Sequence, residues 1–231
     1  MPLARFNPDA QPRLIRLGRE QSPVVLIDDA LLNPDAIVDH AATQARFQSA
    51  RATLYPGLNA ELSPHVASGI VMPLQALLRD TFAIDFKDAA FSGYYGLVTA
   101  TPSDLTRRQA IPHYDVTERP RALAVLLYLC DSDMGGTGFY RHRATGFETI
   151  GPARAAPYLA AVERELAAHP GQQAYFDGSD DDFDRIGKVE AEYNRLIIYD
   201  GSLLHSALVA PDRLSADPRK GRLTANIFIK V

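Results

Sequence analysis

The sequence is poor in cysteine and tryptophan and carries little net charge. Its 231 residues include one cysteine, Cys130, and no tryptophan. An intrachain disulfide is therefore excluded, and a reducing compartment such as the cytoplasm is expected. Lysine and arginine number 24 against 28 acidic residues, a formal charge of −4. This balance predicts that neither nucleic acid nor an anionic membrane surface is a partner.

Long apolar runs are also missing. Prolines and charges interrupt the stretch MPLARFNPDAQPRLIRLGRE, so we expect neither a signal peptide nor a membrane span there. Hydrophobic residues still make up 46% of the chain, which is enough to bury one sizeable core. We therefore predict one domain over residues 1–231.

Residues 1–90 predict a strand and two supporting helices. SPVVLIDD has the composition of a strand. The dipeptides Asn33-Pro34 and Ser63-Pro64 each supply an N-cap and a first-turn proline for a helix. Pro73 is expected to kink the second helix in its middle, because a proline cannot donate a backbone hydrogen bond. We expect both helices to support a sheet.

From Phe91 onward the chain is rich in short β-like runs. They are FSGYYGLVT, IPHYDV, ALAVLLYLC, TGFYRH, GFETI, RLIIYDG, SALVA and RLTANIFIKV. Many short strands with turn signals between them predict a closed barrel or a jelly roll. The expected fold class is therefore mainly β with flanking helices (α+β), with the core over residues 91–231.

One segment interrupts these strands. PYLAAVERELAAH is helical by pattern and is followed by the acidic stretch GSDDDFDRIGK. We interpret residues 153–191 as an insertion between two strands. Its position makes it a candidate lid that shapes the access of substrate.

Three residues have the pattern of a metal site. Side chains at i and i+2 of a strand point the same way, so IPHYDV presents the imidazole of His113 beside the carboxylate of Asp115. His205, in YDGSLLHSALV, lies just beyond another strand and can complete the set. Two imidazoles and one carboxylate form the facial triad of iron(II) oxygenases, which leaves positions open for substrates and oxygen.

The order of the motifs is more specific than any one of them, because a His-x-Asp triplet alone also arises by chance. IPHYDV followed by LLYLCDSDMGGTGFY, and LIIYDGSLLHSALV followed by GRLTANIFI, resemble the prolyl 4-hydroxylase-like members of the iron(II)- and 2-oxoglutarate-dependent dioxygenases. The resemblance covers residues 91–231 apart from the insertion. It implies a double-stranded β-helix, or jelly roll, that hydroxylates a peptidyl side chain, an amino acid or a small metabolite and releases succinate and CO2.

The resemblance also implies roles for the matching residues. His113, Asp115 and His205 would be the catalytic iron ligands. Related halogenases replace this carboxylate with a small residue to admit halide, so Asp115 favours hydroxylation or another oxidation.

A second group of residues would bind the 2-oxoglutarate co-substrate. The resemblance implies that Arg222 and Tyr128 hold its distal carboxylate, because a guanidinium fork matches a carboxylate and a phenol adds a donor. Tyr94 and Tyr95 are further candidates for this pocket, since the family has a tyrosine upstream of the metal pair. The loop from either tyrosine to the metal pair is longer than the family pattern.

The interval between His205 and Arg222 is also longer than is usual in the family. Arg213 and Arg219 in the intervening loop are therefore alternative anchors for the co-substrate. Arg222 is favoured because it opens the strand RLTANIFI, whereas the other two lie among proline, aspartate and serine.

Two other functions remain open from the sequence. One is a cupin-like metal-dependent enzyme that does not use 2-oxoglutarate, and the other is a barrel that binds a ligand without catalysis. His142 in YRHRATG either forms part of a basic rim with its flanking arginines, where it meets a substrate carboxylate, or lies on the solvent side of an edge strand. Edge strands in such folds often pair, so a homodimer is a further hypothesis.

Overall fold

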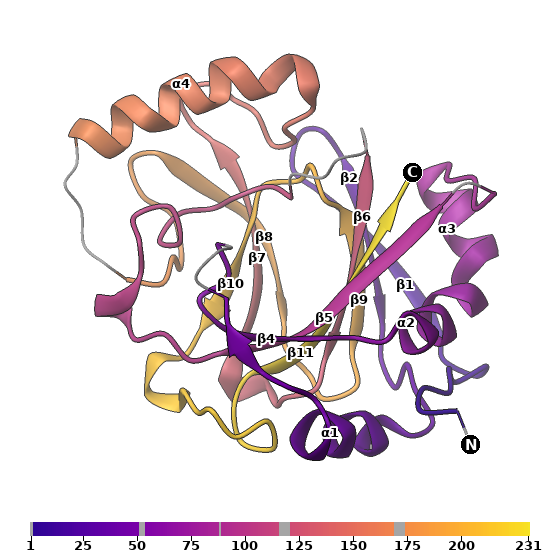
Figure 1. Cartoon of the computed structure of the whole chain (residues 1–231). Coiled ribbons are helices and arrows are strands. Elements are labelled where there is room, and N and C mark those ends of the chain that lie inside the picture. The colour runs from indigo at the N-terminus through magenta and orange to yellow at the C-terminus, as the bar shows by residue number, and fades with distance from the viewer. Residues whose placement is uncertain (1, 51–53, 88, 116–120, 169–173) are drawn as a thin grey trace.

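The protein folds into two antiparallel β-sheets that face each other, with helices on their outer sides (Figure 1). The computed structural model describes residues 2–50, 54–87, 89–115, 121–168 and 174–231. Residues from all five ranges contribute to the sheets or to the helices around them. The predicted class, mainly β with flanking helices, is confirmed.

The larger sheet contains eight strands: β1 (Pro12–Leu17), β2 (Ser22–Ile27), β3 (Gln48–Ser49), β4 (Gly57–Glu61), β5 (Ala90–Val98), β6 (Ala122–Tyr128), β9 (Leu196–Asp200) and β11 (Leu223–Lys230). Their order is β1-β2-β9-β6-β11-β5-β4-β3. The smaller sheet contains β7 (Gly135–His142), β8 (Phe183–Glu190) and β10 (His205–Val209) in the order β10-β7-β8.

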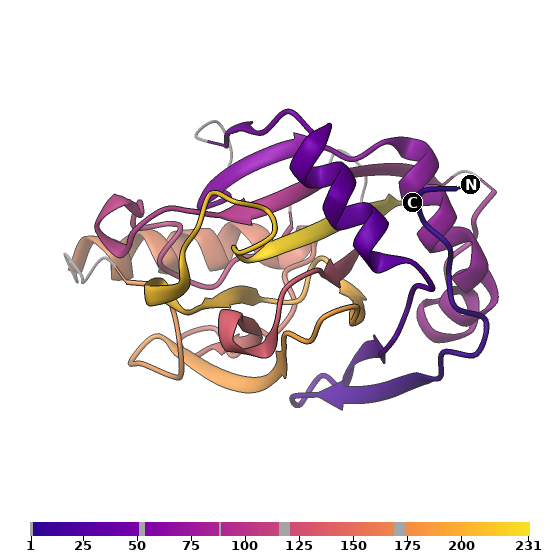
Figure 2. The same cartoon turned by 90° about the horizontal axis from the view of Figure 1, so that it is seen from below.

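The helices are α1 (Pro34–Thr43), α2 (Pro64–Val71), α3 (Gln75–Phe82) and α4 (Pro152–Ala168), with short 3-10 turns η1 (Met72–Leu74), η2 (Pro102–Asp104), η3 (Ser132–Met134) and η4 (Pro211–Arg213). Seen from below, α1 lies in front of the strands and α4 behind them (Figure 2). None of the helices in the described part of the chain is long and apolar enough to cross a membrane.

Strand alternation divides the interior into separate cores. Along β11, Leu223, Ala225 and Ile227 pack against the helices α1 to α3. The residues between them face the smaller sheet, so that side of the larger sheet is free to line a cavity. A second core lies between the sheets, where the rings of Phe139 and Tyr199 meet edge to face with their centres 5.2 Å apart. A third core lies between the smaller sheet and α4.

Several elements differ from the sequence-based prediction. The helix expected to kink at Pro73 is divided into α2, η1 and α3. IPHYDV and GFETI were both expected as strands. Through Asp115 the first forms only a single bridge, between His113 and His205, and the second forms only one between Thr149 and Leu203. The last residue of IPHYDV, Val116, lies outside the described residues.

Residues 153–191, predicted as an insertion between two strands, contain both a helix and a strand of the smaller sheet. Their first part is helix α4, but their last part is β8, which pairs with β7 in the smaller sheet. Phe183 and Val189 are buried, and this apolar burial fixes the strand although acidic residues precede it. Residues 169–173 of this segment lie outside the described residues.

Candidate metal centre

Two segments far apart in the sequence bring the three predicted ligands together. The backbones of His113 and His205 exchange two hydrogen bonds of 2.8 Å. The amide of Asp115 donates to the carbonyl of Gly201, also at 2.8 Å. The segment that carries the His-x-Asp pair is therefore fixed along the turn between β9 and β10, at the point where β10 begins with the second histidine.

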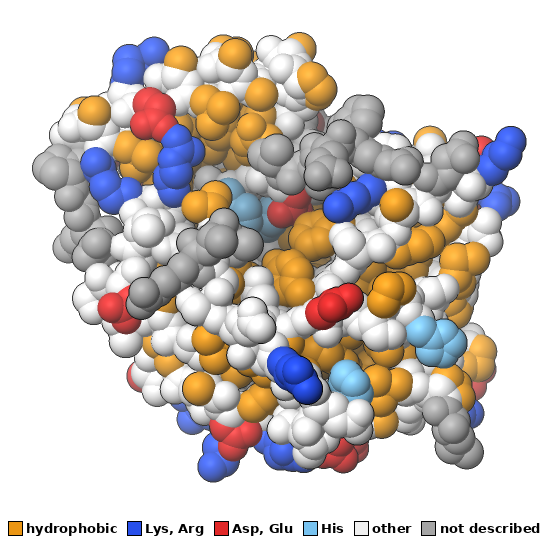
Figure 3. Space-filling view, viewed as in Figure 1, with side chains coloured by type: hydrophobic (Ala, Val, Ile, Leu, Met, Phe, Trp, Pro, Cys, Tyr) orange, Lys and Arg blue, Asp and Glu red, His pale blue; other side chains and the backbone are white. Residues whose placement is uncertain are grey.

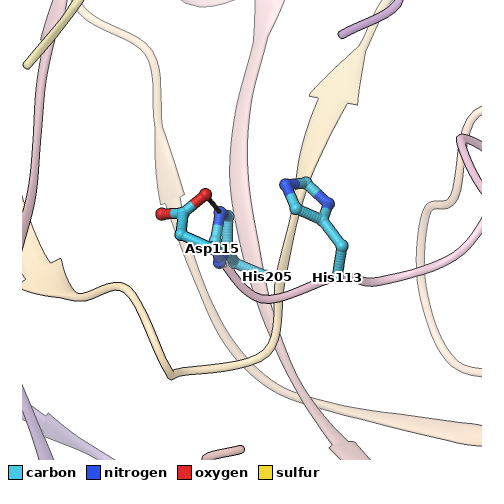
Figure 4. A group of neighbouring side chains, drawn as sticks. All are labelled: His113, Asp115 and His205. Carbon is cyan, nitrogen blue, oxygen red and sulfur yellow. Dashed lines mark ion pairs between the residues drawn. The ribbon is translucent and has the colours of Figure 1, made fainter. Parts of the chain in front are cut away.

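The side chains of the triad point toward a common space (Figure 4). One nitrogen or oxygen from each of His113, Asp115 and His205 lies within 4.8 Å of the others. The two imidazole ring centres are 4.4 Å apart. Nε2 of His205 lies 3.9 Å from Oδ1 of Asp115, which is too long for a hydrogen bond. The donor atoms are thus close without bonding directly to each other.

Burial sets the charge of the triad. Loss of hydration lowers the pKa of His113 to about 4, and the neighbouring His205 adds to this effect. Burial likewise lowers the pKa of His205 to about 4. It raises the pKa of Asp115 to about 6, against the attraction of His113. Near neutral pH both imidazoles are unprotonated, which is the form that ligates metal.

The donor set fits a divalent cation. Nδ1 of His205 lies 2.8 Å from the carbonyl oxygen of Leu203. A carbonyl only accepts, so Nδ1 carries the proton and the lone pair of Nε2 is left facing Asp115. Oδ2 of Asp115 is buried and has no hydrogen-bond partner in the part of the chain that the structure describes. A buried carboxylate without a partner is costly, and a cation between it and the two imidazoles removes that cost.

A cavity of about 430 Å³ opens beside the triad and extends between the two sheets. It is lined by Leu54, Tyr55, Pro56, Asn59, Tyr94, His113, Tyr114, Asp115, Ala124, Val125, Leu126, Thr137, Tyr199, His205, Ala207, Arg222, Thr224, Asn226, Ile227 and Phe228. Figure 3 shows hydrophobic side chains gathered in a hollow at the centre of one face of the molecule. The volume suits a small organic ligand.

Arg222 lies in the same cavity as the triad. Arg222 is buried, with only 4% of its surface exposed. Its Nη2 donates to the carbonyl of Gly136 at 2.7 Å, but its Nε is buried and finds no partner among the residues that the structure describes. By contrast, Arg213 pairs with Asp133 and Arg219 pairs with Asp39, and neither lines the cavity. The structure therefore brings Arg222, and not the two alternative arginines, to the site.

The predicted tyrosines have different positions. Tyr94 lines the cavity. Tyr95, the next residue on β5, points to the opposite face of the sheet, where its hydroxyl lies 3.1 Å from Nδ1 of His40. Tyr128 is buried behind the cavity wall, and its hydroxyl forms a 2.6 Å hydrogen bond with Thr137. The carbon of the Arg222 guanidinium lies 5.8 Å from its ring centre.

Sequence reasoning missed several residues at the site. Thr224 and Asn226 follow Arg222 at two-residue intervals and share its face of β11, so the alternating pattern of RLTANIF could have identified them. Thr137 lies on the facing sheet, and Tyr55 comes from the segment just before β4. No pattern in the sequence links either of these two to the triad.

Both interpretations of His142 are wrong. Its strand, β7, is central in the smaller sheet, and the imidazole is fully buried. Nδ1 of His142 lies 2.9 Å from Oγ1 of Thr145, and Nε2 lies 2.9 Å from Oε2 of Glu165, a residue of α4. The histidine thus connects α4 to the sheet, because burial of its polar atoms requires such partners.

Helix α4 also supports the segment that carries the metal pair. The hydroxyl of Tyr158 donates to the carbonyl of Pro112 at 3.4 Å, and its ring contacts that of Tyr114 with centres 5.9 Å apart. The helix is therefore a structural support in the described conformation. This contact argues against the view of residues 153–191 as a separate lid.

Removing the Tyr158 side chain is expected to weaken this support. Tyr158 is 3% exposed, so Tyr158→Ala leaves a cavity under the helix and should lower the free energy of unfolding by about 3 kcal/mol. Leu159→Ala, at a neighbouring residue that is 37% exposed, is the control and should change it by less than about 1 kcal/mol. Urea denaturation measures both values. Equal values for the two variants would contradict the proposed support.

Nearly the whole chain matches one protein family. The sequence matches the profile of a family of unknown function, DUF6445, over residues 8–229. The chain belongs to the DUF6445 family. The match includes all three residues of the triad and Arg222, but the description of the family assigns them no activity. No curated protein matches the chain by sequence.

Solved structures give the fold of this family member. The non-haem α-ketoglutarate-dependent epimerase SnoN of nogalamycin biosynthesis aligns with 91% of this chain and 80% of its own, at 13% identity and a TM-score of 0.50. An N-substituted L-amino acid dioxygenase from Burkholderia ambifaria AMMD aligns with 95% and 94% of the two chains, at 14% identity and a TM-score of 0.43. The likeness to SnoN shows the fold alone, and it confirms the predicted jelly-roll core.

Proposed function

We propose that this protein is a non-haem iron(II)- and 2-oxoglutarate-dependent oxygenase. One observation carries the proposal. A triad of two imidazoles and one carboxylate, of which His205 is buried and the other two are partly buried, shares a cavity with the buried guanidinium of Arg222, whose Nε has no partner among the described residues. A facial triad suits iron(II), and the buried cation calls for an anionic ligand in the same cavity. 2-Oxoglutarate satisfies both demands, since it can chelate a metal at one end and has a carboxylate at the other.

Each residue has a defined task in this proposal. His113, Asp115 and His205 hold iron(II), and the hydrogen bond from His205 to the carbonyl of Leu203 keeps its ring oriented. Arg222 binds the distal carboxylate of 2-oxoglutarate. Tyr128 supports this contact through Thr137, because its hydroxyl is already bonded to that side chain.

The metal and the oxo-acid would supply the oxidising chemistry when bound, with dioxygen as the oxidant that converts 2-oxoglutarate to succinate and CO2 and oxidises the substrate. The chain contributes position and exclusion of water. Ala124, Leu126 and Phe228 line the cavity with apolar surface, which limits the access of water to the reacting groups. We infer hydroxylation of a small-molecule or peptidyl substrate, in the manner of the prolyl 4-hydroxylase-like enzymes, as the specific reaction.

The experiment that tests this proposal begins with binding. Protein purified under argon is mixed with iron(II) and 2-oxoglutarate, and the weak visible charge-transfer band of the chelate is recorded. Oxygen is then admitted and succinate is measured. We expect the band, and succinate whose formation stops when a chelator removes the metal. Metal binding without the band would favour the cupin-like alternative, and the absence of metal binding would favour a non-catalytic barrel.

A further inference from the structure

Three aromatic rings form one wall of the cavity. The rings of Tyr55 and Tyr94 meet edge to face with centres 5.7 Å apart, and those of Tyr94 and Phe228 lie 6.1 Å apart. These residues come from the segment before β4, from β5 and from β11. We call them the aromatic shelf. Leu54, which is half exposed, extends this apolar surface toward solvent.

Polar groups converge at one end of the aromatic shelf, above Gly96. This glycine pairs with Asn59 on one side and with Thr224 on the other. A Cβ at position 96 would lie 2.5 Å from the hydroxyl of Tyr55 and 2.8 Å from Nδ2 of Asn226. The glycine therefore leaves room for these groups to approach each other over the bare backbone.

One of these groups lacks a partner among the described residues. Oδ1 of Asn59 is buried and accepts no hydrogen bond from them, although buried polar atoms are nearly always bonded. Since a carbonyl oxygen accepts only, a hydroxyl or an N–H of a bound molecule is the partner that it calls for. Nδ2 of Asn226 donates to Thr224 at 2.9 Å and retains a second hydrogen, because an amide nitrogen has two.

The charges of the cavity restrict the ligand further. Among the described residues that line it, Asp115 and Arg222 are the only aspartate, glutamate, lysine or arginine side chains. Both already have a task, one with the metal and the other with the oxo-acid. A free amino acid would bring an ammonium and a carboxylate into a cavity whose described walls hold no further counter-charge, and this burial is unfavourable.

We propose that the aromatic shelf and Asn59 bind an uncharged ring compound that carries hydroxyl or N–H groups, and that this is the substrate class of the oxygenase. The ring packs on the faces and edges of the three aromatic side chains. The hydroxyl or N–H groups bond to the amides above Gly96. The ring would then lie in the cavity that also contains the triad. The inference rests on the proposed function for its chemistry, but the binding itself can be tested separately.

The test compares two probes that share a phenyl ring. Phenyl β-D-glucoside is uncharged and rich in hydroxyls, whereas L-phenylalanine is a zwitterion. Binding is measured by saturation-transfer NMR on protein loaded with 2-oxoglutarate and Zn(II), which is diamagnetic and does not activate oxygen. We expect the glucoside to bind at least about tenfold more tightly than the amino acid. Equal affinities, or tighter binding of L-phenylalanine, would overturn the proposal.

Two variants locate the binding. Phe228→Ala removes part of the aromatic shelf and should weaken the glucoside about fivefold. Asn59→Ala removes the acceptor and should weaken it by a similar factor, about fivefold. Leu14→Ala, at an exposed residue of β1 outside the cavity, is the control and should leave the affinity unchanged. Circular dichroism checks that each variant is folded. Retained affinity in both folded cavity variants would also overturn the proposal.

The same titration on metal-free protein without 2-oxoglutarate separates this inference from the proposed function. If the charge-transfer band never forms but the glucoside still binds in a manner that depends on Phe228 and Asn59, the proposed activity fails and the ring site stands. If the band forms and the glucoside does not bind, the activity stands and the ring site fails.

Discussion

Arg222→Ala is expected to weaken the binding of 2-oxoglutarate by at least about a hundredfold, because loss of one partner of a buried charge pair costs about 3–5 kcal/mol. The guanidinium is buried, and its Nε is free to donate to the distal carboxylate. Iron binding should be unchanged, since Arg222 is not among the groups of the triad. Titration of the charge-transfer band with 2-oxoglutarate measures the effect.

Matched variants make this result specific. Arg213→Ala removes an arginine that is paired with Asp133 outside the cavity, and it should leave the affinity for 2-oxoglutarate unchanged. Arg222→Lys keeps the charge but loses the planar fork of donors, so an intermediate affinity is expected. If Arg222→Ala bound the co-substrate as tightly as the wild type, the assignment of 2-oxoglutarate would lose its main support.

His205→Ala is expected to abolish stable iron binding and with it all succinate formation. The triad offers three protein ligands to one ion. Changing a residue that only supports a ligand typically lowers metal affinity about 10- to 100-fold, so loss of a ligand itself should lower the affinity for iron by more than that. Equilibrium dialysis against iron(II) under argon measures the loss. His65→Ala, at an exposed position of α2, is the control and should bind iron as the wild type does.

Asp115→Asn distinguishes loss of a ligand from unfolding. In metal-free protein Oδ2 of the carboxylate is buried without a partner among the described residues, so a neutral amide of similar shape should make that form more stable than metal-free wild type. The same variant should bind iron more weakly, because the negative ligand is gone. A variant that was less stable without metal and yet bound iron normally would contradict the assignment of Asp115.

The sequence predicted the three residues that the structure brings together as a candidate metal site, but only part of the cavity beside them. His113 and Asp115 share a face because of local two-residue spacing, and the order of the later motifs indicated His205. The choice between Tyr94 and Tyr95 also depends on local alternation, since the apolar positions of β5 that face the helices include Tyr95 and Leu97. The alternation along FSGYYGLVT therefore distinguishes the two tyrosines.

Other features depended on tertiary contacts that no local pattern encodes. Tyr55 reaches the cavity because Gly96 on a neighbouring strand leaves space for its hydroxyl. His142 has a polar environment in the sequence, yet it is buried because Glu165 and Thr145 supply partners for both ring nitrogens. The acidic residues before β8 favoured the prediction of a loop, but pairing with β7 places a strand there.

The mutual backbone hydrogen bonds of His113 and His205 have a consequence for folding. The main chain of each histidine is hydrogen-bonded to that of the other. The two imidazoles are therefore brought together only after the segments that carry them have docked. A cation bound there would act as a reversible cross-link between distant parts of the polypeptide, and free metal would then shift the folding equilibrium toward the native state by mass action. In the proposed metalloenzyme, capture of the ion and acquisition of the native structure would thus be a single linked equilibrium.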